Sequence, residues 1–381
     1  MYQAGFEQPL GKSYNVNIAY QKDVGFNTVA EVAYVGNFGR EPGRFVDVNR
    51  LPLNVYGNPV NLVNNSPLNA NSLRTVYGQY PGMGSVMAFV PDLYAESLRY
   101  NGLQLNVVRR LSAGLQMGMA YTLSKAEGYN PSTNFGEGYD PYTDEAGGEQ
   151  AIKARYWGPT PEDRRHNLAV NYSYNIPGVA TNGFLKYLTS DWQVSGVTRL
   201  LSGQAVTPSC VSNNAGIQNS NPSLTDGFYN TQRLLTARCE LTGEPIFSGY
   251  TVDANLPYPD QPHFNVAAFR MPSPNGSQGN FGNSPVGILR NPTWHEWDVT
   301  VSRRFAVGAR KNAGVKLQLQ AYNVFNEVQF TTLNATYTFT GPNNSINNNA
   351  NTGKYVATGG SNLAAGTIQP RTMGLTVRFD W

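Results

Sequence analysis

Residues 167–176 read NLAVNYSYNI, and their side chains alternate between two kinds along the whole stretch. Every second residue is large and apolar or aromatic: Leu168, Val170, Tyr172, Tyr174 and Ile176. The residues between them are Asn, Ala or Ser. Because successive side chains of a β-strand point to opposite faces, the stretch predicts a strand with one apolar face and one polar face.

The same alternation recurs in eight other stretches of the chain. They cover residues 14–21, 26–36, 98–112, 115–124, 191–203, 297–305, 315–321 and 371–381. Strands in soluble proteins are usually about five to six residues long, and many of these stretches are longer. We therefore predict an all-β protein with about nine long antiparallel strands in an up-and-down meander.

The connections between these stretches alternate between short and long. The short ones are residues 22–25, 113–114, 177–190 and 308–312. The long ones are residues 37–97, 127–162, 204–293 and 327–369. Tight turns at one rim and large loops at the other are typical of outer-membrane barrels, whose short turns are periplasmic and whose long loops are external.

The hydropathy pattern is compatible with a membrane, although no run of about 18 apolar residues predicts a transmembrane helix. A membrane-spanning barrel strand needs only about 9–11 alternating residues. Lipid cannot hydrogen-bond the backbone, so a spanning sheet must be closed, with an apolar outer face. A soluble β-sandwich would have the same alternation with its apolar face buried. Strand length and loop asymmetry favour part of a large transmembrane barrel.

Composition excludes some classes of partner. The net charge is only +3 and no run of Lys and Arg has the length of a patch, so we expect no nucleic-acid partner. The first residues lack the basic and apolar segments of a signal peptide. We therefore expect the chain to be mature or truncated.

Several phrases occur in an order that resembles the C-terminal barrel of Oar-like TonB-dependent outer-membrane receptors. They are FNTVAEVAYVGNFGR (26–40), YNGLQLNVVRRLSAGLQMGMAYTLSKA (100–126), GPTPEDRRHNLAVNYSYNIP (158–177), WQVSGVTRLLSGQAVTP (192–208), FNVAAFRMP (264–272), GNFGNSPVGILRNPTWHEWDVTVSRRF (279–305) and LQLQAYNVFNEVQF (317–330). The resemblance covers nearly the whole chain. It implies a barrel segment that takes up an unknown substrate across the outer membrane of a Gram-negative bacterium when it is part of the full-length protein.

The resemblance also implies what the chain lacks and what it contacts. Members of the family have an N-terminal plug and about 22 strands, so residues 1–381 are expected to be a C-terminal fragment with an open sheet. We expect no enzyme activity and no cofactor. The expected partners are outer-membrane lipid, the barrel-assembly machinery and, only through the missing N-terminal part, the TonB complex. Phe379 and Trp381, at the end of the last strand, are similar to the outer-membrane assembly signal.

Few residues qualify for a chemical site. Cys210 and Cys239 lie in one polar region and could form a loop disulfide or remain two thiols. His166, His263 and His295 include no pair at metal-ligand spacing.

Three other polar features are interpreted as parts of the rim or of loops. We interpret the charged residues 162–166 as a strand entrance at the outer rim and the carboxylates of residues 137–150 as a solvated loop rather than a Ca²⁺ site. Residues 341–353, GPNNSINNNANTG, are interpreted as a mobile polar loop. Aromatic residues near the ends of runs match an interfacial girdle: Tyr14, Trp192, Trp297 and Trp381.

Two other functions stay open at the level of sequence. A non-transporting outer-membrane adhesion protein would use the large loops for attachment. A secreted all-β carbohydrate-binding or hydrolytic domain would carry paired acidic residues on strands that face a groove, whereas the polar parity here is mainly Asn, Gln, Ser and Thr.

Overall fold

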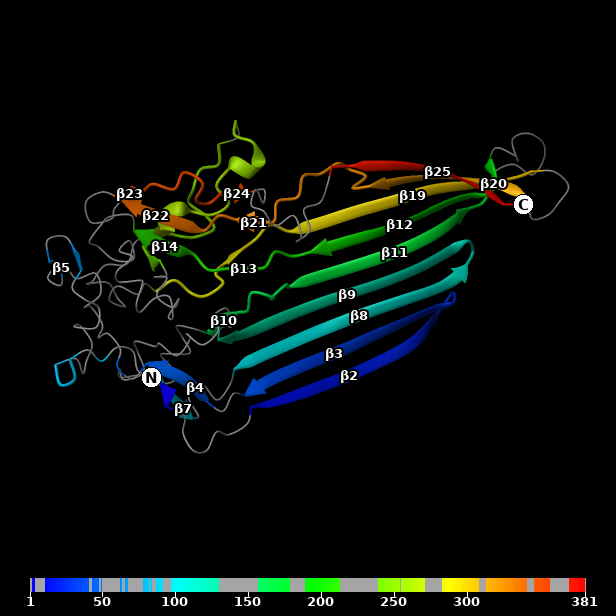
Figure 1. The fold of residues 1–381 in the computed structure, drawn as a ribbon. Coiled ribbons are helices and arrows are strands. Elements are labelled where there is room, and N and C mark those ends of the chain that lie inside the picture. Colours follow the sequence, from blue (N-terminus) through cyan, green and yellow to red (C-terminus); the bar gives the residue numbers. More distant parts are fainter. Residues whose placement is uncertain are drawn as a thin grey trace.

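The computed structural model contains one large antiparallel sheet with smaller strands gathered beyond one of its ends (Figure 1). The structure describes residues 2–3, 11–40, 43–47, 49, 62–63, 66–67, 78–81, 83, 87–91, 97–129, 157–178, 189–212, 239–253, 255–270, 283–307, 313–340, 346–356 and 370–380. Among these residues, no helix has the length and apolar character needed to cross a bilayer.

The large sheet consists of nine long strands, each paired with the next long strand along the chain. They are β2 (Lys12–Gly25), β3 (Thr28–Arg40), β8 (Leu98–Ser112), β9 (Leu115–Tyr129), β11 (His166–Ile176), β12 (Trp192–Leu201), β19 (Trp294–Ala306), β20 (Gly314–Tyr322) and β25 (Thr372–Asp380). All eight pairings are antiparallel. The predicted nine-stranded meander is therefore confirmed. In the described residues the sheet is open, with β2 at one edge and β25 at the other.

The register places the apolar parity of each strand beside the apolar parity of its neighbours. One cross-strand row runs from β2 to β9 through Ile18, Tyr34, Leu103 and Leu123. Another runs from β11 to β25 through Tyr174, Val194, Val301, Leu319 and Leu375. A shift of one residue would turn a whole strand over, so the continuity fixes the register across the sheet.

This continuous apolar face is exposed rather than packed. Ile18 is 68% exposed, Leu375 is 71% exposed and Val377 is 46% exposed. Val170 and Met117, in the middle of the sheet, are only half-buried. Apart from Ala33, the buried apolar side chains of the described residues lie outside the nine strands. A soluble sandwich would bury this face under a second layer, and the structure has the opposite arrangement.

Two turns close their hairpins through left-handed residues. Ala113 and Gly114 form the predicted turn, with φ of 51° and 79°. The first turn differs from the prediction, because β2 continues to Gly25 and the turn consists of Phe26 and Asn27, with φ of 53° and 57°. Positive φ at both central positions gives a two-residue turn whose twist matches that of the flanking strands.

We call the end of the sheet with these turns the turn end and the opposite end the loop end. β3 continues to Arg40, so the first long connection starts later than the predicted residue 37. The short strand β10 (Trp157–Pro159) extends the sheet at the loop end by pairing with β9. The first long connection also contains β4 (Gly43–Asp47), β5 (Leu62–Val63), β6 (Ser66–Pro67) and β7 (Met87–Pro91), with β1 (Tyr2–Gln3) paired to β7.

The lipid-facing assignment can be tested on neighbouring residues of β25. Leu375→Arg should lower the free energy of unfolding in lipid vesicles by about 2–4 kcal/mol, because it places a cation in hydrocarbon. Thr376→Arg should cost much less, because Thr376 has the opposite parity. The measurement is urea unfolding of the full-length protein in vesicles, followed by tryptophan fluorescence. Equal losses in the two variants would contradict the assignment.

Candidate functional site

Two long connections fold together into a compact body at the loop end of the sheet, which we call the loop unit (Figure 1). Its described parts are residues 204–212, 239–253, 255–270 and 283–293 between β12 and β19, and residues 327–340 and 346–356 between β20 and β25. Its elements are β13 (Ala205–Val206), β14 (Ser209–Ser212), β15 (Glu240–Leu241), η4 (Tyr258–Asp260), η5 (Val266–Ala268), β16 (Phe269–Arg270), β18 (Leu289–Arg290), β21 (Thr332–Leu333), β22 (Thr336–Thr340), β23 (Ile346–Asn347) and β24 (Tyr355–Val356).

The two connections are joined by backbone pairing. β14 from the first connection lies parallel to β22 from the second, with Cys210 opposite Tyr337. The side-chain oxygen of Asn291 also accepts a hydrogen bond from the backbone of Leu333, at 2.9 Å. These contacts link segments that are far apart in sequence, so the order of the loop unit depends on tertiary packing.

The loop unit contains the main hydrophobic core of the described residues. Its buried members are Cys210, Cys239, Phe264, Ala268, Phe269, Leu289, Leu333, Ala335, Tyr337 and Phe339. The ring of Phe269 packs edge-on against Phe264 and at an angle against Tyr337. The Tyr337 hydroxyl donates to the carbonyl of Val266 at 3.0 Å, and burial raises the pKa of that hydroxyl. The ring of Tyr337 therefore packs in the core while its hydroxyl satisfies the backbone carbonyl of Val266.

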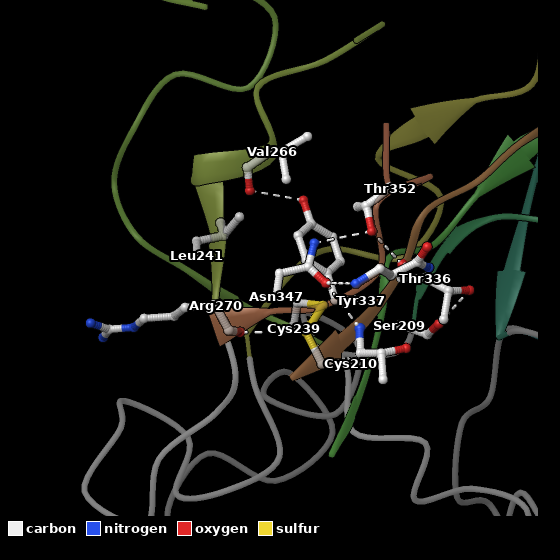
Figure 2. The surroundings of a disulfide bond; sticks show 12 residues. Ser209, Cys210, Cys239, Leu241, Val266, Arg270, Thr336, Tyr337, Asn347 and Thr352 are labelled. Atoms are coloured by element: carbon white, nitrogen blue, oxygen red, sulfur yellow. Dashed lines mark hydrogen bonds between the residues drawn. A yellow bond between two sulfur atoms is a disulfide. The ribbon is translucent and has the colours of Figure 1, made fainter. Parts of the chain in front are cut away.

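A disulfide lies beside this core (Figure 2). Cys210 and Cys239 are bonded, and both are almost fully buried. Sequence reasoning left this pair open between a disulfide and two thiols. The bond connects β14 to the residue before β15 across a sequence separation of 29. The disulfide therefore holds β14 and β15 together on two sides of the hydrophobic core.

The asparagine-rich segment differs from the predicted mobile loop in its described part. Asn347 accepts hydrogen bonds from the backbone of Thr338 and of Asn349, both at 3.1 Å. Thr352 donates to the carbonyl of Thr336 at 2.8 Å, and the side chain of Asn349 donates to the same carbonyl. Figure 2 shows Asn347 and Thr352 facing β22. These short amide side chains satisfy the backbone of a tight turn, which explains their number.

Asp163 fastens the loop unit to the rim of the sheet. Its side chain is fully buried. The carboxylate accepts from the backbone of Ala126 at 2.7 Å and from Arg290 Nη2 at 2.6 Å, and Arg165 Nε lies 3.5 Å away. Arg290 Nη1 also donates to the carbonyl of Asp163 at 3.0 Å. One carboxylate thus connects β9, the residues before β11 and the loop unit.

Two further contacts at this rim involve the ends of the connection between β12 and β19. Arg164 donates to the carbonyl of Ser202 at 2.8 Å, and burial lowers the pKa of its guanidinium. A Cβ on Gly203 would lie 1.7 Å from the carbonyl oxygen of Asn291, so only glycine fits there. The predicted charged strand entrance is therefore a rim junction.

The loop unit also contains an aromatic group of three residues. The rings of His263 and Tyr355 stack with centroids 3.4 Å apart, and Tyr258 meets both of them edge-on. Burial lowers the pKa of His263, so its imidazole is neutral near pH 7. Burial, then the proximity of Tyr258, raises the pKa of Tyr355 to about 12. Tyr258 itself is 62% exposed and offers its ring to solvent.

The remaining predicted residues have separate positions. Phe379 lies at the turn end of β25 on the apolar parity, opposite Val315, and is exposed. Trp381 and residues 137–150 lie outside the described residues. His166 lies at the start of β11, where Nδ1 is 2.8 Å from the Tyr121 hydroxyl. The imidazole Nε2 of His295 contacts the carboxylate of Glu327. The described residues contain no group of three metal-ligating side chains.

Aromatic residues mark both ends of the apolar face. At the turn end, Trp192 lies beside Arg303, whose guanidinium is 5.4 Å from the ring centroid. At the loop end, Tyr14 is half-exposed and Trp297 packs edge-on against Phe325. These positions agree with the two aromatic girdles of membrane barrels.

The sequence matches the family described as outer membrane beta barrel domain over residues 2–373. The chain therefore belongs to this family, and its location is the outer membrane. No curated protein matches the sequence.

The solved structures similar to the chain include three outer-membrane transporters or receptors. The ferric citrate transporter FecA in its unliganded form has 14% identity and a TM-score of 0.34, with 96% of this chain and 31% of that chain covered. The outer membrane transporter YddB from Escherichia coli has 8% identity and a TM-score of 0.37, with 97% and 33% covered. The ferripyoverdine receptor of the outer membrane of Pseudomonas aeruginosa has 10% identity and a TM-score of 0.36, with 97% and 27% covered. The chain spans about a third or less of their length.

Removing the charge of Asp163 should loosen the loop unit. Asp163→Asn should lower the local stability by about 2–3 kcal/mol, because hydrogen bonds to a buried charged group are lost. The measurement is limited proteolysis within residues 239–270 in the full-length protein. Asp253→Asn is the matched control, because Asp253 is exposed and its carboxylate, among the described residues, accepts hydrogen bonds only from Asn255. Equal cleavage rates of the Asp163→Asn variant and the parent protein would contradict the role of Asp163.

Removing the disulfide should also weaken the loop unit. The double variant Cys210→Ser, Cys239→Ser should lose about 2–4 kcal/mol, because the released segment gains conformational freedom when the unit opens. Hydrogen exchange of the backbone amides in β14 and β22 measures this loss. The amides of β11 serve as the internal control, because that strand lies in the large sheet. Unchanged protection in β14 and β22 would contradict the proposed contribution of the disulfide.

Proposed function

We propose that this chain is the C-terminal barrel portion of a TonB-dependent outer-membrane receptor that takes up a substrate. The observation that carries the proposal is the packed loop unit at one end of a membrane-facing sheet, together with the ordered phrases that resemble this class of receptor. A loop body with its own core and a disulfide is pre-organised, and pre-organisation lowers the entropic cost of capturing a ligand.

The proposed orientation puts the loop end outside the cell and the turn end in the periplasm. Short turns on the periplasmic side and long loops on the external side are the rule for bacterial outer-membrane barrels. A disulfide in the loop unit suits an oxidising compartment. In this orientation the exposed ring of Tyr258 and the outer surface of the loop unit meet the medium first.

The polar face of the sheet suits a water-filled or plug-filled lumen. Gln193 donates to Ser173 at 2.9 Å and accepts from Ser302 at 3.4 Å, so neutral side chains bridge three neighbouring strands. Asn, Gln, Ser and Thr bind water without a fixed charge. We propose that further strands, outside residues 1–381, pair with β2 and β25, because unpaired backbone groups cannot stay in hydrocarbon. We also propose that an upstream plug supplies the contact with the TonB complex.

A surface adhesion protein is the second candidate, because large organised loops also suit attachment. The two candidates differ in what lies upstream of Met1 and in what the cell loses without the protein. A receptor needs a plug and an energy-coupling segment, whereas an adhesion protein needs neither. Transport, rather than catalysis, is the activity that we propose for the full-length protein.

Uptake can be tested without knowing the substrate. The producing strain and its deletion mutant are grown in the same medium, and depletion of solutes is followed by mass spectrometry. We expect at least one solute to be depleted only by the parent strain. The complete reading frame should restore this depletion, and a version without the energy-coupling segment should not, although its amount in the outer membrane is unchanged.

The same strains discriminate the alternative. A deletion mutant that depletes every solute normally but no longer attaches to surfaces would overturn the transport proposal and favour adhesion. The Asp163→Asn variant adds a test of the loop unit, because loosened loops should slow uptake at equal barrel content. The Asp253→Asn variant should take up the solute at the parent rate.

A further inference from the structure

Four cations lie on the lipid-facing parity of four neighbouring strands, at the loop end. These rim cations are Lys12 on β2, Arg40 on β3, Arg99 on β8 and Lys125 on β9. Figure 1 shows these strands side by side. The register puts them on the same parity as the exposed row of Ile18, Tyr34, Leu103 and Leu123. They therefore face outward, where the apolar band ends.

On β2 and β3, the outward residues between the cations and the apolar band are aromatic or small. Tyr14 lies opposite Phe38, and Phe38 lies opposite Arg99. The side chains of Tyr34 and Phe38 cover Gly36, where a Cβ would lie 3.0 Å from the Tyr34 hydroxyl and 2.9 Å from the Phe38 ring. Aromatic side chains in this position mark the level of lipid headgroups. In the register, Arg99 shares the row of Tyr14 and Phe38. Lys12 and Arg40 lie two residues beyond this row and Lys125 lies two residues before it, which is about 7 Å along a strand in each case.

The charges of this group are not balanced on the four strands. The one carboxylate at this end of their outward parity, among the described residues, is Glu127, which is ion-paired with Lys125 and lies opposite Arg99. Arg99 also lies over the ring of Trp157, at 5.8 Å. Lys12 and Arg40 lie directly opposite each other on paired strands, and both are exposed. Like charges in that position destabilise a sheet unless an anion offsets them.

We propose that the rim cations bind the phosphorylated headgroup of a lipid in the leaflet on the side of the loops. Long cationic side chains above an aromatic girdle attract anionic headgroups. The spacing of the cations over four strands suits a headgroup that carries more than one phosphate, such as a diphosphorylated glycolipid of the outer leaflet. The site is separate from the loop unit and does not depend on transport. It depends on the proposed orientation, which puts the loop end in the outer leaflet.

The test uses the full-length protein, purified in neutral detergent and freed of lipid. Three probes are added: a diphosphorylated lipid A-type glycolipid, its dephosphorylated form and inorganic phosphate. We expect the phosphorylated glycolipid alone to raise the melting temperature. The double variant Lys12→Gln, Arg40→Gln should bind it about 30-fold more weakly, because each interfacial cation contributes about a fivefold preference for an anionic lipid.

The matched control is the double variant Lys22→Gln, Lys316→Gln. Lys22 has the same outward parity but lies at the turn end, and Lys316 has the opposite parity on β20. Both changes remove as much charge as the test variant and should leave glycolipid binding unchanged. The single variant Lys125→Gln gives a second test, with an expected loss of about fivefold.

A structural role of the rim cations would give a different result. Without lipid, Lys12→Gln, Arg40→Gln should melt at a higher temperature than the parent protein, because the like-charge pair is gone. With the phosphorylated glycolipid present, this double variant should instead melt at a lower temperature than the parent protein. Equal affinity in the test and control variants would overturn the proposal. An equal response to inorganic phosphate would mean a free-anion site, and retention of a glycerophospholipid instead of the glycolipid from native membranes would overturn the assignment to the outer leaflet.

Discussion

The structure depends on one constraint, which is that lipid offers no hydrogen bonds to a polypeptide backbone. Paired strands satisfy this constraint within the sheet, and their side chains then have two different surroundings. The apolar parity of all nine strands forms one exposed face, while Gln193, Ser173 and Ser302 bond to one another on the opposite face. The usual arrangement of a soluble protein is thereby reversed, and the packed core lies outside the sheet.

The strands could be predicted from the sequence because their signal is local. Alternation in NLAVNYSYNI is visible within ten residues, and it repeats wherever the chain crosses the sheet. Boundaries were less well predicted, because turn conformation does not follow from polarity. Phe26 and Asn27 adopt positive φ at the tip of the first hairpin, although the aromatic ring of Phe26 favoured placing it in the strand.

The loop unit could not be predicted, because its contacts join residues that are distant in sequence. β14 and β22 pair across more than a hundred residues, and neither strand is long enough to show a period. The cluster at residues 162–166 was recognised as charged, but the burial of Asp163 depends on Arg290, which is 127 residues away. The two cysteines were the one local hint that this region has a fixed structure.

The sheet and the loop unit are stabilised by different solvents, and this separation explains why the rim junction is ionic. The sheet needs hydrocarbon around it, whereas the loop unit keeps its own core and a disulfide. Burial of Asp163 removes its charge from water, so the carboxylate must be satisfied by partners from each segment that it joins. Ala126, Arg165 and Arg290 supply those partners. Charge-assisted hydrogen bonds of this kind require a specific geometry. The junction can therefore hold the loop unit in one position at the end of the membrane-spanning sheet.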